Sequence, residues 1–255
     1  VTVVGTGGIG KTTLAASFVA RFGWRWPGGV IGVSLADLPT LRAESVLLIL
    51  LERLGIDTRS VAHLPATALA ELLQQSSQER QCLLLIDNYE NVLELLRVPS
   101  TGTRDSKPDD STPAGSAPIA DITHSDITHS DITHAQTLHH LLALLAQQGI
   151  SYLLTSRQQP AGFVGEMLFP TPNQPLEGLD VAAGAELFFA NCPSAIRDRR
   201  QYTSLARQVA TVTEGHPLAI ALLGGEYETS RDSVSTTQFL AQWDLELAAA
   251  YRPGL

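Results

Sequence analysis

Near its amino terminus the chain reads Gly5-Thr6-Gly7-Gly8-Ile9-Gly10-Lys11-Thr12. This order fits the pattern G-x-x-x-x-G-K-[ST], which is typical of a loop that wraps the phosphates of a nucleotide. Residues 1–4 before the loop are β-branched, as in a buried strand, and the apolar residues of 14–22 behind it recur at helical spacing. Strand, glycine-rich loop and helix form the context that this pattern needs in order to bind phosphate.

Each residue type in the loop has a chemical reason to be there. Glycine lets the backbone turn its N–H groups toward phosphate oxygens, and the positive end of the helix dipole adds to the attraction. The ammonium of Lys11 is expected to reach the β- and γ-phosphates, and the Thr12 hydroxyl to hold Mg²⁺. The residues expected to line the phosphates are Gly5, Gly7, Gly8, Ile9, Gly10, Lys11 and Thr12.

Composition and charge restrict the possible functions. The 255 residues suffice for one large domain or two smaller ones, and 44% hydrophobic with 17% charged residues is typical of a globular protein. The net charge of -9 argues against direct nucleic-acid binding by this segment. No apolar run approaches the ~20 residues of a membrane span, so we expect no membrane partner.

The cysteines bear on the cell compartment, and the first residue bears on whether the sequence belongs to a longer protein. Cys82 and Cys192 lie far apart and show neither metal-binding nor disulfide spacing, which predicts buried thiols in a reducing compartment. Without a signal peptide, we expect a cytoplasmic protein. Because Val1 is not a starting methionine and already belongs to the first expected strand, we expect a segment of a longer protein.

The order of apolar runs predicts an α/β fold. Expected strands at 30–33, 82–86, 150–155 and 167–169 alternate with helical patterns, including 41–54 and 65–75. Such alternation predicts a parallel sheet flanked by helices, here of the P-loop NTPase kind. After residue 170 only helical patterns remain, at 180–190, 198–214, 217–228 and 237–251. We therefore expect a nucleotide-binding domain at 1–172 and a small all-helical domain at 173–255.

Residues 98–135 interrupt this pattern. They begin rich in Ser, Thr, Pro, Gly and Asp, and then repeat Asp-Ile-Thr-His from Asp121, Asp126 and Asp131. Such a composition predicts a disordered low-complexity insertion. The histidines of the repeat could instead bind a metal, but a spacing of five turns successive helical side chains by about 140°, away from a shared face.

Asp87 directly follows the apolar run 82–86, at the expected carboxyl end of a buried strand. A carboxylate in this position is typical of the aspartate that holds Mg²⁺ through water in phosphate-binding loops, so Thr12 and Asp87 are the expected metal ligands. Fast ATPases usually place a glutamate next, whereas Asn88 cannot accept a proton. We therefore expect slow hydrolysis, with Glu90 left as an alternative general base.

Arg157 ends the segment Leu-Leu-Thr-Ser-Arg, just past the expected strand at 150–155. An arginine at this edge of a parallel sheet can contact the γ-phosphate and stabilise charge during phosphoryl transfer. Lys11, Asp87 and Arg157 are thus the expected catalytic residues. A surface salt bridge is the alternative interpretation of Arg157.

Four segments occur in the order found in STAND-class signalling ATPases: GTGGIGKTT (5–13), LLLIDNYE (83–90), LLTSR (153–157) and GHPLAI (215–220). The chain resembles the NB-ARC or AP-ATPase-type module of a bacterial regulator or sensor. The resemblance implies that Thr13 contacts the α-phosphate, Arg157 senses the γ-phosphate, and Pro217 packs near the adenine or contacts ADP. It also implies that one strand separates the first strand from the strand ending at Asp87.

The resemblance implies a function and partners as well. Such modules rest closed on ADP, open with ATP and Mg²⁺, and then form homo-oligomers, while flanking sensor and effector domains of the longer chain supply signal and output. We expect a regulatory switch with slow hydrolysis. The alternative is a turnover ATPase of the AAA+ type acting on a macromolecular substrate, or a kinase-like enzyme. An inactive scaffold is a third interpretation, disfavoured because Lys11, Thr12, Asp87 and Arg157 are all present.

Overall fold

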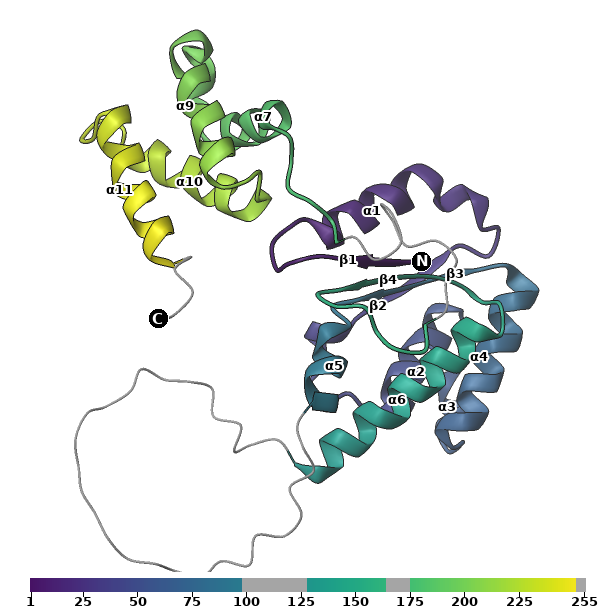
Figure 1. Ribbon diagram of the computed structural model, residues 1–255. Helices are drawn as coiled ribbons and strands as arrows, with labels where there is room; N and C mark the ends of the chain where they lie inside the picture. The colour runs from purple at the N-terminus through teal and green to yellow at the C-terminus, as the bar shows by residue number, and fades with distance from the viewer. Residues whose placement is uncertain (98–127, 164–174, 251–255) are drawn as a thin grey trace, which may run out of the picture. The chain divides into compact units, whose positions relative to one another are not determined.

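A computed structural model describes residues 1–97, 128–163 and 175–250 (Figure 1), with side chains described up to residue 243. The chain forms two compact units. Unit 1 consists of Val1–Thr2 and Ala15–Leu168, and unit 2 consists of Val3–Leu14 and Phe169–Leu255. The expected boundary after residue 172 falls in the range 164–174, outside the described residues, and stays a prediction.

A four-stranded parallel sheet runs through the α/β part of the chain, in the order β1-β4-β3-β2. Its strands are β1 (Thr2–Val4), β2 (Val30–Ser34), β3 (Leu83–Asp87) and β4 (Ser151–Ser156). The expected α/β class with a parallel, helix-flanked sheet is confirmed. The expected separation of the first strand from the Asp87 strand is also found, since β4 lies between β1 and β3. The strand expected at 167–169 lies outside the described residues.

Helices cover both faces of this sheet. They are α1 (Lys11–Phe22), α2 (Ala43–Arg53), α3 (Thr58–Val61), α4 (Ala66–Arg80), α5 (Glu90–Arg97) and α6 (His129–Gln147), with short 3₁₀ turns η1 (Gly23–Arg25) and η2 (Leu35–Asp37). In Figure 1, α1 lies on one side of the sheet and α2, α4 and α6 lie on the other. The last three pack against one another and form a single apolar core with β2, β3 and β4.

The core of unit 1 follows directly from two periodicities. In β3, Leu84 and Ile86 alternate onto the core face, as side chains of a strand must. In α2, Val46, Leu47 and Leu50 recur on one helical face and are each 0% exposed. The continuous apolar runs of the sequence are therefore the elements that meet in the interior.

Leu50→Ala is expected to lower the free energy of unfolding by about 2–5 kcal/mol, because it removes three buried carbon atoms (Cγ, Cδ1 and Cδ2) and leaves a cavity. Urea denaturation followed by circular dichroism measures the change. The matched control is Leu144→Ala on α6, a leucine that is 36% exposed, for which we expect a markedly smaller loss. Equal losses in both variants would contradict the assignment of Leu50 to the core.

The expectation of disorder up to residue 135 is wrong for residues 128–135. Helix α6 begins at His129, and Thr128 and Asp131 form a reciprocal capping box, with hydrogen bonds of 3.2 Å from the Asp131 amide to the Thr128 hydroxyl and 3.0 Å from the Thr128 amide to Asp131. Ile132 and Ala135 are buried in that helix. The second copy of the repeat thus supplies the N-cap Thr128, and the third copy supplies Asp131 and the buried Ile132 and Ala135. Residues 98–127 lie outside the described part of the chain.

Unit 2 contains the all-helical part that the sequence predicts after residue 170. Its helices are α7 (Val181–Asn191), α8 (Pro193–Arg197), α9 (Arg199–Val212), α10 (Pro217–Ser230) and α11 (Thr236–Ala250). Helix α7 packs against α9 and α10, around a core that contains Phe188, Val209 and Ile220. Gly184 permits this close approach, since a Cβ on it would lie 2.7 Å from Ala210 Cβ.

Glu228 of α10 fastens the start of α8 in unit 2. Its Oε2 accepts hydrogen bonds from the Cys192 thiol (3.1 Å) and the Ser194 amide (3.0 Å), and its Oε1 accepts one from the Ser194 hydroxyl. These hydrogen bonds hold the pKa of Glu228 below its ordinary value. Burial, with help from the Glu228 hydrogen bond, raises the pKa of the Cys192 thiol to about 11.

Stability is therefore expected to fall between pH 9 and about pH 11 through Cys192. The unfolded thiol loses its proton near the ordinary pKa of 9.0, whereas the folded thiol keeps it to about 11, so the contribution is complete below pH 9 and lost above 11. Urea unfolding at several pH values, compared between the natural chain and Cys192→Ala, isolates this contribution from those of other groups that titrate at alkaline pH. Identical pH dependence in both chains would contradict it.

Candidate functional site

The glycine loop, residues 5–10, joins β1 to α1 and belongs to unit 2. Two of its glycines adopt left-handed backbone angles, with φ of 74° at Gly8 and 96° at Gly10. Non-glycine residues rarely adopt these angles, so the pattern G-x-x-x-x-G corresponds to a real conformational need at its last glycine and at Gly8. The turn then enters α1, where the Leu14 amide donates to the Gly10 carbonyl at 2.8 Å.

Lys11 is the first residue of α1 and is only 7% exposed. Its Nζ donates to the carbonyl oxygens of Gly5 and Thr6, both at 2.9 Å. A buried ammonium needs such hydrogen-bond acceptors to offset its lost hydration. The loop therefore curls around a cation at the positive end of a helix dipole, an arrangement whose electrostatics favour an anion.

Three other predicted residues, Ile9, Thr12 and Thr13, are close to Lys11 in the sequence. Ile9 is buried, which anchors the loop, while Thr12 and Thr13 are exposed in the first turn of α1. An exposed hydroxyl at the helix start is accessible to a ligand, as the Mg²⁺ role predicted for Thr12 and the phosphate role implied for Thr13 both require. Both roles stay predictions.

Residues 215–217 (Gly-His-Pro, the GHP segment) lead into α10 and contact the glycine loop within unit 2. His216 is the N-cap of α10, and its Nδ1 accepts a hydrogen bond from the Ala219 amide at 3.4 Å. Its Nε2 must then carry the proton, and it donates to the Gly7 carbonyl at 2.8 Å. The Leu218 amide donates to the Gly8 carbonyl at 3.3 Å. Sequence reasoning missed His216, although its position before Pro217 was the signal of a cap.

Pro217 and the two left-handed glycines are thereby brought together. A Cβ placed on Gly10 would lie 4.0 Å from Pro217 Cγ, and one on Gly8 would lie 2.8 Å from His216 Cε1 and Leu218 Cβ. Position 8 therefore requires glycine for two reasons: its left-handed backbone angle and the close approach of this segment. The loop and the GHP segment, predicted separately from the sequence, form one cluster.

Asp87 ends β3 in unit 1 and is held by hydrogen bonds from two neighbours. The Thr155 hydroxyl of β4 donates to its Oδ1, and the Asn88 side-chain amide donates to its Oδ2 at 3.1 Å. The same amide donates to the Ser34 hydroxyl of β2 at 3.2 Å. Since Ser34 pairs with Asp87 in the sheet register, the carboxyl ends of three adjacent strands converge on this carboxylate.

Asn88 adopts a left-handed φ of 59°, which asparagine tolerates better than most residues. Its backbone amide donates to the Thr155 hydroxyl at 3.1 Å. The residue that the sequence excluded as a general base thus has a structural role: it orients Asp87. Thr155, which sequence reasoning did not single out, shares that role.

Arg157 forms an ion pair with Glu90, at 3.2 Å between Nε and Oε1, and a longer one of 3.8 Å with Glu94. The Glu90 side chain is 9% exposed and that of Arg157 56%, so one partner is buried and the other reaches solvent. Unit 1 therefore contains the salt bridge that was the alternative interpretation of Arg157. Contact of Arg157 with a phosphate stays a prediction, as does a catalytic role of Glu90.

No three His, Cys, Asp or Glu side chains gather into a metal site among the residues that the structure describes. Mg²⁺ in nucleotide sites usually needs fewer protein ligands, because water and phosphate oxygens complete its shell. A hydroxyl such as that of Thr12 and a carboxylate such as that of Asp87 are the right donor types. Across the described parts of the chain, no helix is both long and apolar enough to cross a membrane.

The predicted site residues therefore fall into two groups. Unit 2 joins the glycine loop, Lys11, Thr12 and Thr13 with Pro217, and unit 1 holds Asp87 and Arg157 at the ends of β3 and β4. Comparison with models of protein families and with curated proteins finds no match to this chain.

Proposed function

We propose that this chain is an ATP- and ADP-binding regulatory module of the STAND class, with Mg²⁺ as its metal and slow hydrolysis as its chemistry. The observation that carries the proposal is the curled glycine loop with the buried Lys11 ammonium at the start of α1. A bound nucleotide would supply the phosphate charge that this cation and the loop amides are suited to hold. The P-loop NTPase type of the fold is part of the same proposal.

Contacts within unit 2 support the switch interpretation. The hydrogen bonds of His216 and Leu218 to the carbonyls of Gly7 and Gly8 link the first turn of α10 to the loop that would hold phosphate. Any rearrangement of the loop on nucleotide binding must therefore change the hydrogen bonds that hold the start of α10 against the loop. A switch requires such differential contacts, because a ligand with equal affinity for two states shifts neither.

The side chains that follow Asp87 in unit 1 support slow rather than rapid hydrolysis. Asn88 occupies the position after Asp87 and uses its amide to orient that carboxylate, so it cannot deprotonate water. Glu90 has one oxygen engaged by Arg157. In this proposal, Arg157 exchanges Glu90 for the γ-phosphate, which makes the ion pair the resting state of the sensor arginine.

The wider proposal follows from the same family resemblance. It includes a cytoplasmic location, flanking sensor and effector domains, and assembly into a homo-oligomer in the ATP state. A turnover ATPase of the AAA+ type acting on a macromolecular substrate is the competing proposal. The position of Asn88 and the ion pair of Glu90 disfavour it.

The deciding experiment identifies the nucleotide that the purified full-length protein releases on denaturation, by ion-exchange chromatography. Near-stoichiometric ADP, absent from a Lys11→Ala preparation, is the expected result. An empty site combined with rapid steady-state ATP turnover would replace the switch by the turnover ATPase. No nucleotide and no affinity for added ATP or ADP would overturn both.

A further inference from the structure

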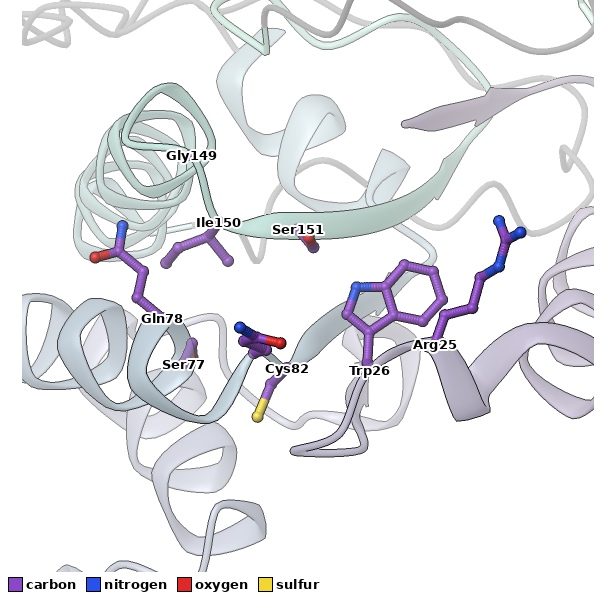
Figure 2. A pocket seen from close by; sticks show the side chains of 9 residues that line it. Arg25, Trp26, Ser77, Gln78, Cys82, Gly149, Ile150 and Ser151 are labelled. Carbon is purple, nitrogen blue, oxygen red and sulfur yellow. The ribbon is translucent and has the colours of Figure 1, made fainter.

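A cavity lies in unit 1 at the amino ends of β3 and β4, the edge of the sheet opposite to Asp87. It is open to solvent on one side, has a volume of about 320 Å³, and its lining includes Arg25, Trp26, Ser77, Gln78, Gln81 and Ser151. Figure 2 shows Trp26 across the cavity from Ser77 and Gln78, with Ser151 between them. A volume of this size lies at the lower end of the range found for small-molecule sites.

Ser77 carries the strongest sign of a missing ligand. The residue is 2% exposed, and its hydroxyl has no hydrogen-bond partner within the described ranges 1–97, 128–163 and 175–243. A buried hydroxyl without a partner is destabilising, so such groups are normally satisfied by protein, water or ligand. Ser77 also lines the cavity. Its oxygen is covered in the present rotamer, so a bound molecule supplies the missing partner once the side chain turns about χ1 toward the cavity.

The wall of the cavity is held in a strained and closely packed form. Gln81 ends α4 in the left-handed region, at φ 56° and ψ 59°, where glycine is the usual residue. A Cβ on Gly28 would lie 2.3 Å from the Arg80 carbonyl oxygen and 2.5 Å from Cys82 Sγ, so the turn that carries Trp26 presses against the start of β3. Strain of this kind persists where the surroundings maintain it, and it often marks a binding site.

Two lining side chains are already fixed in place. The Gln78 side-chain amide donates to the Gln148 carbonyl at 2.9 Å, which ties the end of α4 to the end of α6. The Trp26 indole packs on Phe18, with ring centroids 5.9 Å apart. A ligand would therefore lose little free energy in ordering these groups, since they are preorganised.

The lining selects for a particular chemistry. Trp26 offers an aromatic face, while Ser77, Ser151 and Gln81 offer neutral hydroxyl and amide groups that can both donate and accept. The one charged lining residue, Arg25, has its guanidinium near the rings of Phe22 and Trp24, at 5.9 and 5.7 Å, and Figure 2 shows it extending away from Ser77 and Gln78. A phosphate or carboxylate therefore finds no cation inside.

We propose that this cavity is a second small-molecule site, which binds a neutral planar heterocycle of nucleoside size by stacking on Trp26 and hydrogen bonding to Ser77. The site is separate from the glycine loop and stands whether or not that loop binds nucleotide. Stacking on an indole accepts any flat heterocycle, so the hydrogen bond to Ser77 supplies the selectivity.

Guanosine is the probe, because it is uncharged and its base is planar and rich in donors and acceptors. It is titrated into the full chain in the presence of saturating ADP and Mg²⁺, which would occupy a nucleotide site at the glycine loop. Isothermal titration calorimetry gives the affinity. Fluorescence of the double variant Trp24→Phe/Trp243→Phe, whose remaining tryptophan is Trp26, shows whether guanosine binds next to Trp26. We expect saturable binding of one guanosine, with a change in Trp26 emission.

Two variants and two controls locate the binding. Ser77→Ala is expected to weaken guanosine binding about tenfold, the value of one hydrogen bond, and Ser151→Phe, which fills the cavity, to abolish it. Ser76→Ala makes the same change one residue away on α4, outside the lining, and should leave the affinity unchanged, as should Lys11→Ala. Absence of saturable binding, binding that survives Ser151→Phe, or loss of binding in Lys11→Ala would each overturn the proposal.

Discussion

Lys11→Ala is expected to weaken ATP and ADP binding at least ~100-fold, the equivalent of about 3 kcal/mol. In the folded chain the ammonium is buried and bound to the carbonyls of Gly5 and Thr6. A phosphate offers that cation a charged acceptor, and charge-assisted hydrogen bonds are about twice as strong as neutral ones. Alanine removes the cation and leaves two carbonyl oxygens to face the phosphate, so the loop becomes repulsive where it was attractive.

Isothermal calorimetry with ATP and ADP, each with Mg²⁺, measures the effect. The chain contains a natural control, because Lys107 is its only other lysine. Lys107→Ala makes the same change in charge and composition and should keep the original affinity. Unchanged affinity in Lys11→Ala would remove the glycine loop from the nucleotide site, and with it the proposed function.

Asp87→Asn is expected to reduce Mg²⁺-dependent ATP hydrolysis at least ~100-fold while changing nucleotide affinity less than ~10-fold. The carboxylate is the predicted metal ligand of β3, and a neutral amide binds Mg²⁺ poorly. The structure adds a second effect. An amide nitrogen at this position would face a donor, either the Thr155 hydroxyl or the Asn88 amide, both of which now donate to the carboxylate. The new donor–donor contact would displace the strand ends as well.

The measurement is the hydrolysis rate as a function of Mg²⁺ concentration, with affinity determined separately by calorimetry. Asp232→Asn, at a side chain that is 93% exposed, is the matched control and should behave like the natural chain. Full activity with an unaltered Mg²⁺ dependence in Asp87→Asn would exclude this carboxylate from the site. Equal loss of binding and hydrolysis would instead indicate that it supports the fold alone.

Most of the secondary structure could be predicted, because it is encoded locally. The apolar runs predicted as strands at 30–33, 82–86 and 150–155 correspond to β2, β3 and β4, and Pro217 begins α10 as its fixed backbone angle favours. The glycine pattern placed the loop correctly between β1 and α1. The error at residues 128–135 had a specific cause: composition indicated disorder, whereas the capping box and the burial of Ile132 and Ala135 favour a helix.

The sequence by itself thus determined the helices and strands, the parallel sheet and the residues that flank the loop, since these depend on periodicity, backbone angles and caps within a few residues. Only the tertiary structure decided the partners of the candidate site. Three of its contacts join residues that are distant in sequence. They are the ion pair of Arg157 with Glu90 and the hydrogen bonds from His216 to Gly7 and from Asn88 to Ser34. Such contacts form where packing of the whole chain brings side chains together, and no local pattern encodes them.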